Sequence, residues 1–372
     1  MPEPTPDQNL HLPSLVIKNF RGIDELTIPR LGRVTLLAGK NGVGKTTVLD
    51  SIKAYAALGR ANVLASILRN REEVRRLTDE DGAGMMTTDW SAMFYGREMP
   101  TETSIRIGPM NDGPDLTVGC MWTSRREAGM FQPSLFPEDD VLVLRIVFGE
   151  QQQPYVPIDY PIDGIRRHRA ATLALEMHTE TVCETLGPGL PRNSDLARYW
   201  DEVVLTDDES LAMEALNLVL DAAVNGIAVV GDPPQRGSVR GRRVVVKIAG
   251  QAMPVPLQSL GDGAVRLFGV ALALANSRDG FLVIDETENG IHHSIQRDFW
   301  KMVMQTAERN NVQVIATTHS WDCVVGFAHA ANELEEVEGL LVRLERPPAG
   351  LRPITYDASR LKNIAKHGIE VR

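Results

Sequence analysis

The chain has 372 residues, of which 43% are hydrophobic and 24% are charged, and its formal net charge is −10. This length allows one large α/β domain with insertions, or two domains. The negative charge argues against a protein that coats nucleic acid over its whole surface, but it is compatible with a local basic groove. The three cysteines, Cys120, Cys183 and Cys323, are too few and too scattered for a disulfide framework or a zinc cluster.

The N-terminal stretch reads as a short polar tail. Residues 1–11 contain several prolines and acidic or polar side chains, without the apolar stretch of a signal peptide, and we expect them to be disordered. Apolar runs elsewhere stay well below the length of a membrane-spanning helix. We therefore expect a cytoplasmic protein with reduced cysteines and no membrane contact.

The first predicted elements lead into a glycine-rich loop. Two short strands are expected over residues 15–28, around a turn that contains Arg21, and a third strand over residues 33–37. The next residues, Gly39-Lys40-Asn41-Gly42-Val43-Gly44-Lys45-Thr46, fit the pattern G-x-x-x-x-G-K-[ST] in full. An apolar-periodic helix is predicted to follow, from Thr47 to Leu58.

The spacing of this loop has a chemical reason. Its glycines let the backbone bend so that several N–H groups point at phosphate oxygens, and the following helix adds its positive N-terminal end. Lys45 can then reach the β- and γ-phosphates, and the Thr46 hydroxyl can ligate Mg²⁺. The sequence therefore predicts a nucleoside-triphosphate site. Its candidate residues are Gly39, Lys40, Asn41, Gly42, Val43, Gly44, Lys45, Thr46, Thr47 and Arg21.

The middle of the chain is predicted to be an antiparallel meander followed by a helical insertion. Three β-rich runs, at residues 103–107, 116–122 and 141–148, are separated by turn residues. Helical patterns cover residues 166–179 and 208–224, and a strand pair at 243–248 and 253–256 returns the chain to the core. We expect four regions: a tail (1–11), a first lobe (12–150), a helical insertion (151–240) and a second lobe (241–372).

From Leu260 onwards helices and strands alternate, and one strand ends in two carboxylates. A helix is predicted to about Asn276, and a buried strand over residues 281–284 precedes Asp285 and Glu286. Strands buried in a parallel sheet deliver polar residues to the edge where ligands bind. Asp285 suits an Mg²⁺ position, and Glu286 suits the base that orients and deprotonates an attacking water.

Two further segments belong to the predicted site. The next strand, residues 313–316, ends close to His319, which should emerge at the same sheet edge and contact the γ-phosphate. Ahead of the Asp-Glu strand, a loop of small residues opens a helix and exposes backbone N–H groups that suit phosphate. Its candidate residues are Ser259, Gly261, Asp262 and Gly263.

The order of these motifs resembles the ABC-type ATPases, in particular the branch of SMC proteins, RecF and the ATPase half of overcoming-lysogenisation-defect nucleases. Lys18-Asn-Phe-Arg-Gly22 and Asp285-Glu-Thr-Glu-Asn-Gly-Ile-His292 are similar to motifs of that branch. The closing residues 368–372 resemble stand-alone prokaryotic ATPases described only as "AAA family ATPase". The resemblance covers residues 12–55 and 255–325.

The resemblance implies a P-loop NTPase head with a mixed sheet, and a homodimer that sandwiches two ATP molecules with Mg²⁺. In such dimers a signature serine touches the γ-phosphate held by the other protomer. Here Ser259-Leu-Gly261 fits only the looser Ser-x-Gly form of that signature. The glutamine loop of the family has two candidate positions, Gln132 and residues 151–153.

Two functions of different class follow. The first is an ATP-hydrolysing dimer whose conformational switch serves DNA sensing, DNA maintenance or phage defence. The second is an ATP-gated regulatory subunit of a separate effector, such as a Toprim-type nuclease, for which the chain has no room after His319. A transporter subunit is disfavoured by the long insertions. Duplex DNA would contact a cluster of arginines that reads equally well as a solvated loop: Arg236, Arg240, Arg242 and Arg243.

Overall fold

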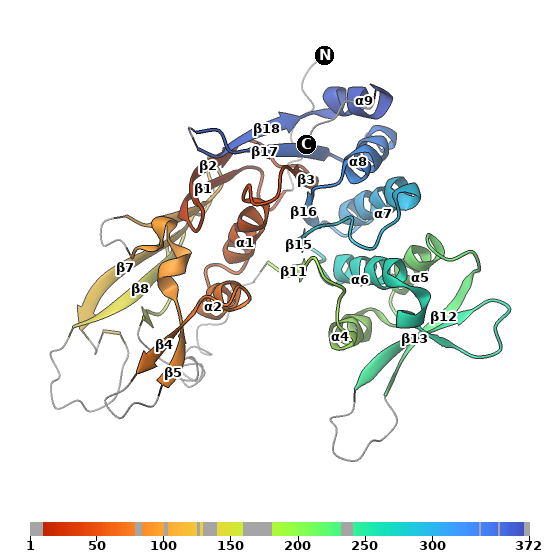
Figure 1. Ribbon diagram of the computed structural model, residues 1–372, viewed down its shortest axis with the longest axis horizontal. Helices are drawn as coiled ribbons and strands as arrows, with labels where there is room; N and C mark the ends of the chain where they lie inside the picture. Colours follow the sequence, from red (N-terminus) through yellow and green to blue (C-terminus); the bar gives the residue numbers. More distant parts are fainter. Residues whose placement is uncertain are drawn as a thin grey trace.

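The computed structural model describes residues 10–78, 84–99, 103–124, 127–128, 140–158, 181–231, 241–334, 336–348 and 350–367. A central sheet with helices on both faces is flanked by two arms, as Figure 1 shows. One arm carries β7, β8 and the β4–β5 hairpin, and the other carries β12 and β13. None of the described helices is long and apolar enough to cross a membrane. The three cysteines are free.

The central sheet is mostly parallel, in the order β11-β15-β16-β3-β17-β18, and only β18 runs antiparallel to its neighbour. Its strands are β3 (Val34–Ala38), β11 (Cys183–Leu186), β15 (Phe281–Ile284), β16 (Gln313–Thr318), β17 (Gly339–Glu345) and β18 (Arg352–Tyr356). Because β16 lies between β3 and β15 and parallel to both, the carboxyl ends of these three strands meet at one edge of the sheet.

Both faces of the central sheet are buried at its middle strands, which explains why β3 and β15 are mostly apolar without alternation. In β3, Val34 and Leu36 face one core and Leu37 faces the other. The first core is built with α6 (Asp262–Asn276), α7 (Gln296–Arg309), α8 (Trp321–Glu333) and α9 (Ala358–His367). The second core is built with α1 (Lys45–Ala56) and α2 (Ala61–Arg69).

An antiparallel sheet packs on the far side of α1, so this helix lies between two sheets (Figure 1). The order is β10-β8-β7-β6-β1-β2, with β9 beside β8, and every pair is antiparallel. The predicted meander is therefore confirmed. The strands are β1 (Leu15–Phe20), β2 (Ile23–Ile28), β6 (Ile105–Gly108), β7 (Leu116–Ser124), β8 (Asp140–Phe148), β9 (Gln151–Gln152) and β10 (Val156–Pro157).

The second arm is a small α/β unit packed on α6. Its members are α4 (Asn193–Val203), α5 (Glu209–Asn217), β12 (Val224–Gly231), β13 (Arg242–Ile248), β14 (Val255–Pro256) and the short 3-10 helix η4 (Leu257–Leu260). Elsewhere the chain adds β4 (Val74–Thr78), β5 (Gly84–Thr88) and the 3-10 helices η1 (Trp90–Met93), η2 (Tyr95–Arg97) and η5 (His293–Ile295).

The expected helical insertion over residues 151–240 is only partly helical in the described part of the chain. Strand β11 joins the central sheet as the parallel neighbour of β15, and β12 forms a hairpin with β13. The sequence of β11, Cys-Glu-Thr-Leu, is too short and too polar to be recognised as a core strand. A strand of this polar composition can pair with β15 because it lies at the edge of the sheet. The predicted helix over 166–179 lies outside the described residues.

Candidate active site

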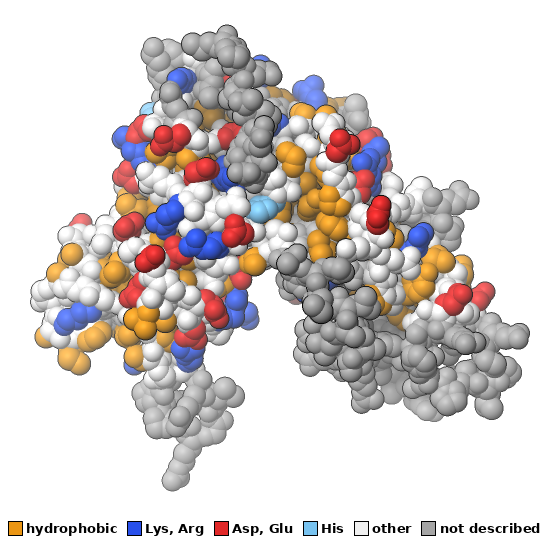
Figure 2. Space-filling view, turned by 180° about the vertical axis from the view of Figure 1, so that it is seen from behind, with side chains coloured by type: hydrophobic (Ala, Val, Ile, Leu, Met, Phe, Trp, Pro, Cys, Tyr) orange, Lys and Arg blue, Asp and Glu red, His pale blue; other side chains and the backbone are white. Residues whose placement is uncertain are grey.

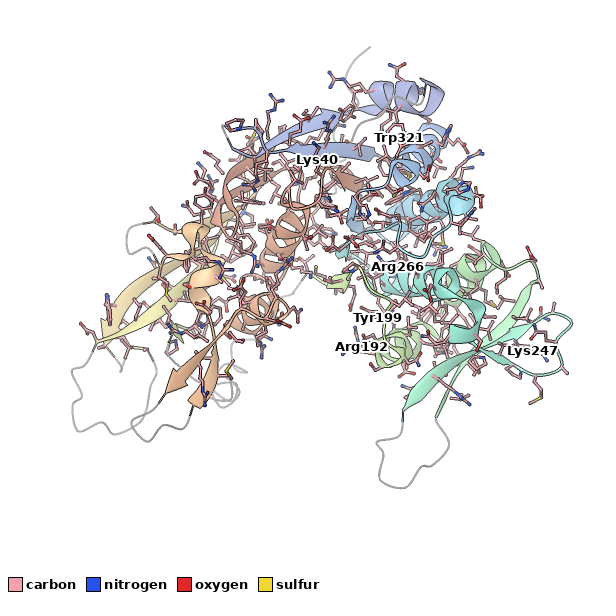
Figure 3. All side chains as sticks on the ribbon, in the orientation of Figure 1. Lys40, Arg192, Tyr199, Lys247, Arg266 and Trp321 are labelled. Carbon is pink, nitrogen blue, oxygen red and sulfur yellow. The ribbon has the colours of Figure 1, made fainter. Side chains whose placement is uncertain are left out.

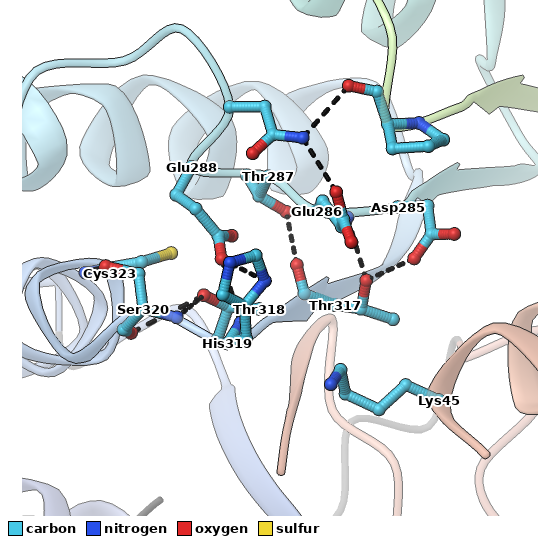
Figure 4. A network of polar contacts seen from close by, with 12 residues as sticks. Lys45, Asp285, Glu286, Thr287, Glu288, Thr317, Thr318, His319, Ser320 and Cys323 are labelled. Atoms are coloured by element: carbon cyan, nitrogen blue, oxygen red, sulfur yellow. Dashed lines mark hydrogen bonds and ion pairs between the residues drawn. The ribbon is translucent and has the colours of Figure 1, made fainter. Parts of the chain in front are cut away.

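The structure brings three of the predicted motifs together at the carboxyl edge of the central sheet. Strand β3 leads into the glycine-rich loop, β15 ends at Asp285 and Glu286, and β16 ends one residue before His319. Figure 4 shows Lys45 on one side of this edge and the two strand ends opposite it. His319 therefore lies at the same sheet edge as Asp285 and Glu286, as its separation from them by one helix and one strand predicts.

The glycine-rich loop folds around the N-terminus of α1. Gly39 and Gly44 have φ values of 146° and 121°, in the region that side-chain-bearing residues rarely adopt. A Cβ at Gly39 would also lie 2.7 Å from the carbonyl oxygen of Leu344. Among the described residues no side chain caps α1, whose N-cap is Gly44, so the N–H groups of its first turn are available for phosphate oxygens.

Lys45 lies inside this loop and faces acidic side chains from β15. Its Nζ donates to the carbonyl oxygens of Gly39 at 2.7 Å and Lys40 at 3.2 Å. Burial lowers the pKa of Lys45, while the negative charges of Glu288, Asp285 and Glu286 oppose that shift. The ammonium group of Lys45 therefore lies between two backbone carbonyl oxygens of the loop and the carboxylates that follow β15.

Thr317, the penultimate residue of β16, contacts the side chain of Asp285 and the backbone of Glu286 (Figure 4). Its Oγ1 donates to Oδ1 of Asp285 at 2.6 Å and accepts from the backbone N–H of Glu286 at 2.9 Å. The backbone of Glu286 is left-handed, with φ of 49°, a strained conformation for a non-glycine residue. Strain of this kind persists where surrounding contacts hold it.

A buried arginine also stabilises the turn that follows β15. Arg266 on α6 is 1% exposed. Its Nη2 donates to the carbonyl oxygens of Asp285 and Glu286 at 2.8 and 3.2 Å, and its Nη1 to those of Gly187 and Gly189 at 2.6 and 3.1 Å. Burial lowers the pKa of Arg266, and nearby carboxylates oppose that shift.

Glu286 and Glu288, which follow β15, accept hydrogen bonds from different partners. Glu286 Oε2 accepts from Asn289 Nδ2 at 2.8 Å, and the same amide donates to the carbonyl oxygen of Pro188 at 3.0 Å. Glu288 Oε1 instead accepts from the backbone N–H of His319 at 2.8 Å and lies 3.0 Å from its Nδ1. His319 is therefore held by Glu288 and not by Glu286.

Sequence reasoning missed the supporting residues Thr317, Glu288, Asn289 and Arg266. Signals for three of them were present: Glu288 and Asn289 stand inside the motif that follows β15, and Arg266 is a lone cation in the apolar run of α6. Nothing in the sequence distinguishes Thr317 from the neighbouring Thr318, because its role depends on a partner in another strand.

The predicted signature loop lies at the start of α6. Ser259, Gly261 and Asp262 are exposed, while Gly263 packs so closely that a Cβ there would lie 2.8 Å from the carbonyl oxygen of Gly290. Within the described residues, no hydrogen bond joins this loop to the glycine-rich loop of the same chain. Figure 3 shows Lys40 of the glycine-rich loop well separated from Arg266 of α6.

Arg21 occupies a charged cluster beside α1. Its backbone N–H donates to the carbonyl oxygen of Met93 at 2.8 Å, and its guanidinium lies 3.9 Å from Glu73. Burial lowers its pKa, with Asp50, Arg71, Glu73 and Arg97 as charged neighbours. A pocket of about 440 Å³ lies between residues 40–43 and 343–347, and its lining residue Arg346 donates to the carbonyl oxygen of Gly22 at 3.0 Å.

The structure describes only part of the candidate DNA and glutamine residues. Arg236, Arg240 and Gln132 lie outside the described residues. Arg242 and Arg243 are exposed on β13, and Arg242 forms a two-point ion pair with Asp201 at 2.5 and 2.7 Å. Gln151 and Gln152 form the exposed strand β9.

The oxygen donors at the sheet edge fit Mg²⁺. No group of three or more His, Cys, Asp or Glu side chains among the described residues could form an all-protein metal cage. Mg²⁺ is commonly held by one or two protein oxygens together with substrate phosphates and waters. Thr46 at the start of α1 and Asp285 at the end of β15 supply oxygens of that kind on the two sides of the site.

Comparisons with protein families match two parts of the chain. Residues 210–322 match a family described as "AAA domain, putative AbiEii toxin, Type IV TA system", and residues 14–81 match one described as "AAA domain". These two stretches contain the glycine-rich loop, the signature loop, the β15 carboxylates and His319.

Characterised relatives are distant. The chain is 25% identical over 146 residues to the DNA replication and repair protein RecF of Corynebacterium jeikeium, covering 39% of this chain and 31% of that protein. It is 20% identical over 349 residues to an ATP/GTP phosphatase of Helicobacter pylori, covering 84% of this chain and 86% of the relative. The chain thus spans less than a third of the RecF relative.

Solved structures that are similar include an SMC head bound to the C-terminal winged-helix domain of ScpA, with 12% identity, 95% and 100% coverage and a TM-score of 0.49. The SMC head domain from Thermotoga maritima has 15% identity, 94% and 100% coverage and a TM-score of 0.42. The chain thus carries AAA-type ATPase domains and has weak similarity to RecF and to an ATP/GTP phosphatase.

Proposed function

We propose that the protein hydrolyses ATP, with Mg²⁺, as a head-to-tail homodimer. Each nucleotide would lie between the glycine-rich loop of one protomer and the Ser259–Gly263 loop of the other. One observation carries this proposal: Ser259, Gly261 and Asp262 are exposed and make no hydrogen bond to the glycine-rich loop of their own chain within the described residues. A second copy related by a twofold axis can supply that loop across the interface.

The side chains at the sheet edge then have separate roles. Lys45 and the N–H groups of α1 bind the β- and γ-phosphates. Thr46 and Asp285 hold Mg²⁺, which when bound neutralises phosphate charge as the terminal bond breaks. Glu286 orients and deprotonates the attacking water, and Asn289 fixes one of its oxygens. His319 contacts the γ-phosphate.

The Glu286→Gln variant tests the enzymatic part of this proposal. The amide keeps the shape of the side chain but cannot take a proton, so the variant should bind MgATP, accumulate as a dimer and release no phosphate. Lys45→Ala is the control, because it should lose binding and therefore dimer. Phosphate release by Glu286→Gln at the wild-type rate would exclude Glu286 as the base.

We further propose that the switch serves duplex DNA in the cytoplasm, in sensing, maintenance or phage defence. Support comes from the RecF relative, a DNA replication and repair protein, and from the exposed arginines of the β12–β13 hairpin. The alternative, gating of a separate effector such as a nuclease, would lead if DNA neither binds nor changes the ATPase rate.

The ion pair between Arg242 and Asp201 gives a direct test of the DNA proposal. If Arg242 contacts phosphate, the Asp201→Asn variant should bind duplex more tightly, because the arginine loses its competing carboxylate. Replacing Arg236, Arg240, Arg242 and Arg243 should reduce the log–log salt slope by about 0.9 for each phosphate that is no longer neutralised. Unchanged binding in both variants, measured by fluorescence anisotropy at low salt, would remove this hairpin from the DNA site.

A further inference from the structure

The pair formed by Glu288 and His319 has a geometry that the proposed catalytic roles do not explain. One carboxylate oxygen, Oε1 of Glu288, is 2.8 Å from the backbone nitrogen and 3.0 Å from the Nδ1 of the same histidine. These two contacts fix both the backbone and the ring of His319. The ring itself lies at the surface, with 42% of its side chain exposed, while the glutamate side chain is 10% exposed.

A purely structural role does not account for this burial. Buried carboxylates that stabilise a fold normally have both oxygens hydrogen-bonded. The second oxygen of Glu288, Oε2, is buried and has no hydrogen-bond partner among the described residues. The hydrogen bond that the described structure gives this carboxylate comes from the backbone N–H of His319, and the ring Nδ1 lies 3.0 Å from the same oxygen (Figure 4).

We infer that Glu288 is a positioning residue for His319, which sets the ring orientation and the nitrogen that carries the proton. A carboxylate accepts hydrogen bonds, so the ring nitrogen beside it, Nδ1, must be the donor. Because the partner of one ring nitrogen decides the state of the other, Nε2 is left as the atom for the substrate. This inference rests on the proposed contact between His319 and the γ-phosphate.

Glu286 and Glu288 have different hydrogen-bond partners, and we assign them different roles. Glu286 is tied to Asn289 and is available to the attacking water, whereas Glu288 is committed to the histidine. An orienting group that acts through a histidine typically changes turnover without changing substrate affinity. For histidines that ligate a metal, removing such a partner costs on the order of ten- to a hundredfold in function, and we expect a loss of similar size here.

The state of the ring can be measured without nucleotide. In protein labelled with ¹⁵N-histidine, long-range ¹H–¹⁵N spectra distinguish the two neutral forms of the ring, and His319→Gln assigns the signal among the eight histidines. Wild-type His319 should carry its proton on Nδ1, and Glu288→Ala should lose that preference. A wild-type ring protonated on Nε2, or an unchanged ring state in Glu288→Ala, would overturn the inference whether or not the protein hydrolyses ATP.

Kinetics supply a second readout. Glu288→Ala should lower kcat by about ten- to a hundredfold with little change in the Kd for MgATP. Glu288→Gln should recover most of kcat, because its amide oxygen still accepts from Nδ1. A Gln variant as slow as the Ala variant would show that the charge of Glu288 is what matters, and would overturn the positioning role.

A matched control is available on the helix that follows His319. Glu333, at the end of α8, pairs with Arg297 and Lys301, and Glu333→Gln removes a carboxylate whose partners are two surface cations and not His319. Its kcat and its His319 spectrum should match wild type. Thermal unfolding of all variants identifies any that lose their fold, and in that case the wild-type ring state and the Gln variant still decide the question.

Discussion

The hydroxyl of Thr317 donates a 2.6 Å hydrogen bond to Oδ1 of Asp285. The same hydroxyl oxygen accepts from the backbone N–H of Glu286 at 2.9 Å, and Thr317 is fully buried. One side chain of β16 thus orients the proposed metal ligand and the backbone of the proposed base, both at the end of β15. This link joins two motifs that stand far apart in the sequence.

Replacing Thr317 by valine should therefore slow turnover more than it unfolds the protein. The change keeps the side-chain volume but leaves a buried N–H and a carboxylate oxygen without this partner, at a cost of about 1–3 kcal/mol. We expect ATPase activity to fall by roughly ten- to a hundredfold, since about 1.4 kcal/mol corresponds to a factor of ten. Thr306→Val, a buried change on α7 away from the site, is the control. Equal activities in the two variants would contradict the role of Thr317.

Arg266 should be essential for stability as well as for the site. Its guanidinium donates to four carbonyl oxygens from two segments, and methionine in its place would leave them without these bonds in the interior. We expect Arg266→Met to lower the free energy of unfolding by about 3 kcal/mol or more, measured by urea denaturation.

The control for that measurement is Arg278→Met. Arg278 is half-exposed and pairs with Asp208, so its replacement should cost about 1 kcal/mol or less. If Arg266→Met were no more destabilising than this surface change, the hydrogen bonds of Arg266 would not be what holds the turn after β15.

Gly263 connects the proposed signature loop to the segment after β15. A Cβ at this position would lie 2.8 Å from the backbone oxygen of Gly290, so Gly263→Ala must shift one of the two backbones. We expect a folded protein with reduced ATPase activity, because the shift displaces the exposed loop. Gly226→Ala on β12, where a Cβ meets nothing within 4 Å, should keep its activity. An active Gly263→Ala would show that this close approach is tolerant of change.

Motifs made of consecutive residues could be predicted from the sequence, and contacts between distant residues could not. The glycine-rich loop, the apolar strand before Asp285 and the strand before His319 are each local patterns, and the parallel order of β3, β16 and β15 brings them to one edge. The antiparallel meander was equally readable, since its strands alternate and are separated by turns.

The features that could not be predicted from the sequence share a physical reason. Strand β11 owes its place to a neighbouring strand and not to its own composition, and the hairpin of β12 depends on pairing with β13. Glu288 is one acid among several in the sequence, and its partner, His319, follows a different strand. Such residues are selected by three-dimensional partners, which a single sequence does not reveal.

The most direct test of the account is a mixture of two inactive variants. Lys45→Ala removes the phosphate contact of its own protomer, and Ser259→Arg blocks the exposed loop that would complete the site of the other. Each variant alone should be inactive. In an equal mixture whose protomers exchange, each mixed dimer contains one intact site and one doubly altered site, so ATPase activity should return, up to about half of the wild-type rate. Full activity of Ser259→Arg alone, or no recovery in a mixture shown to contain mixed dimers, would contradict the shared site.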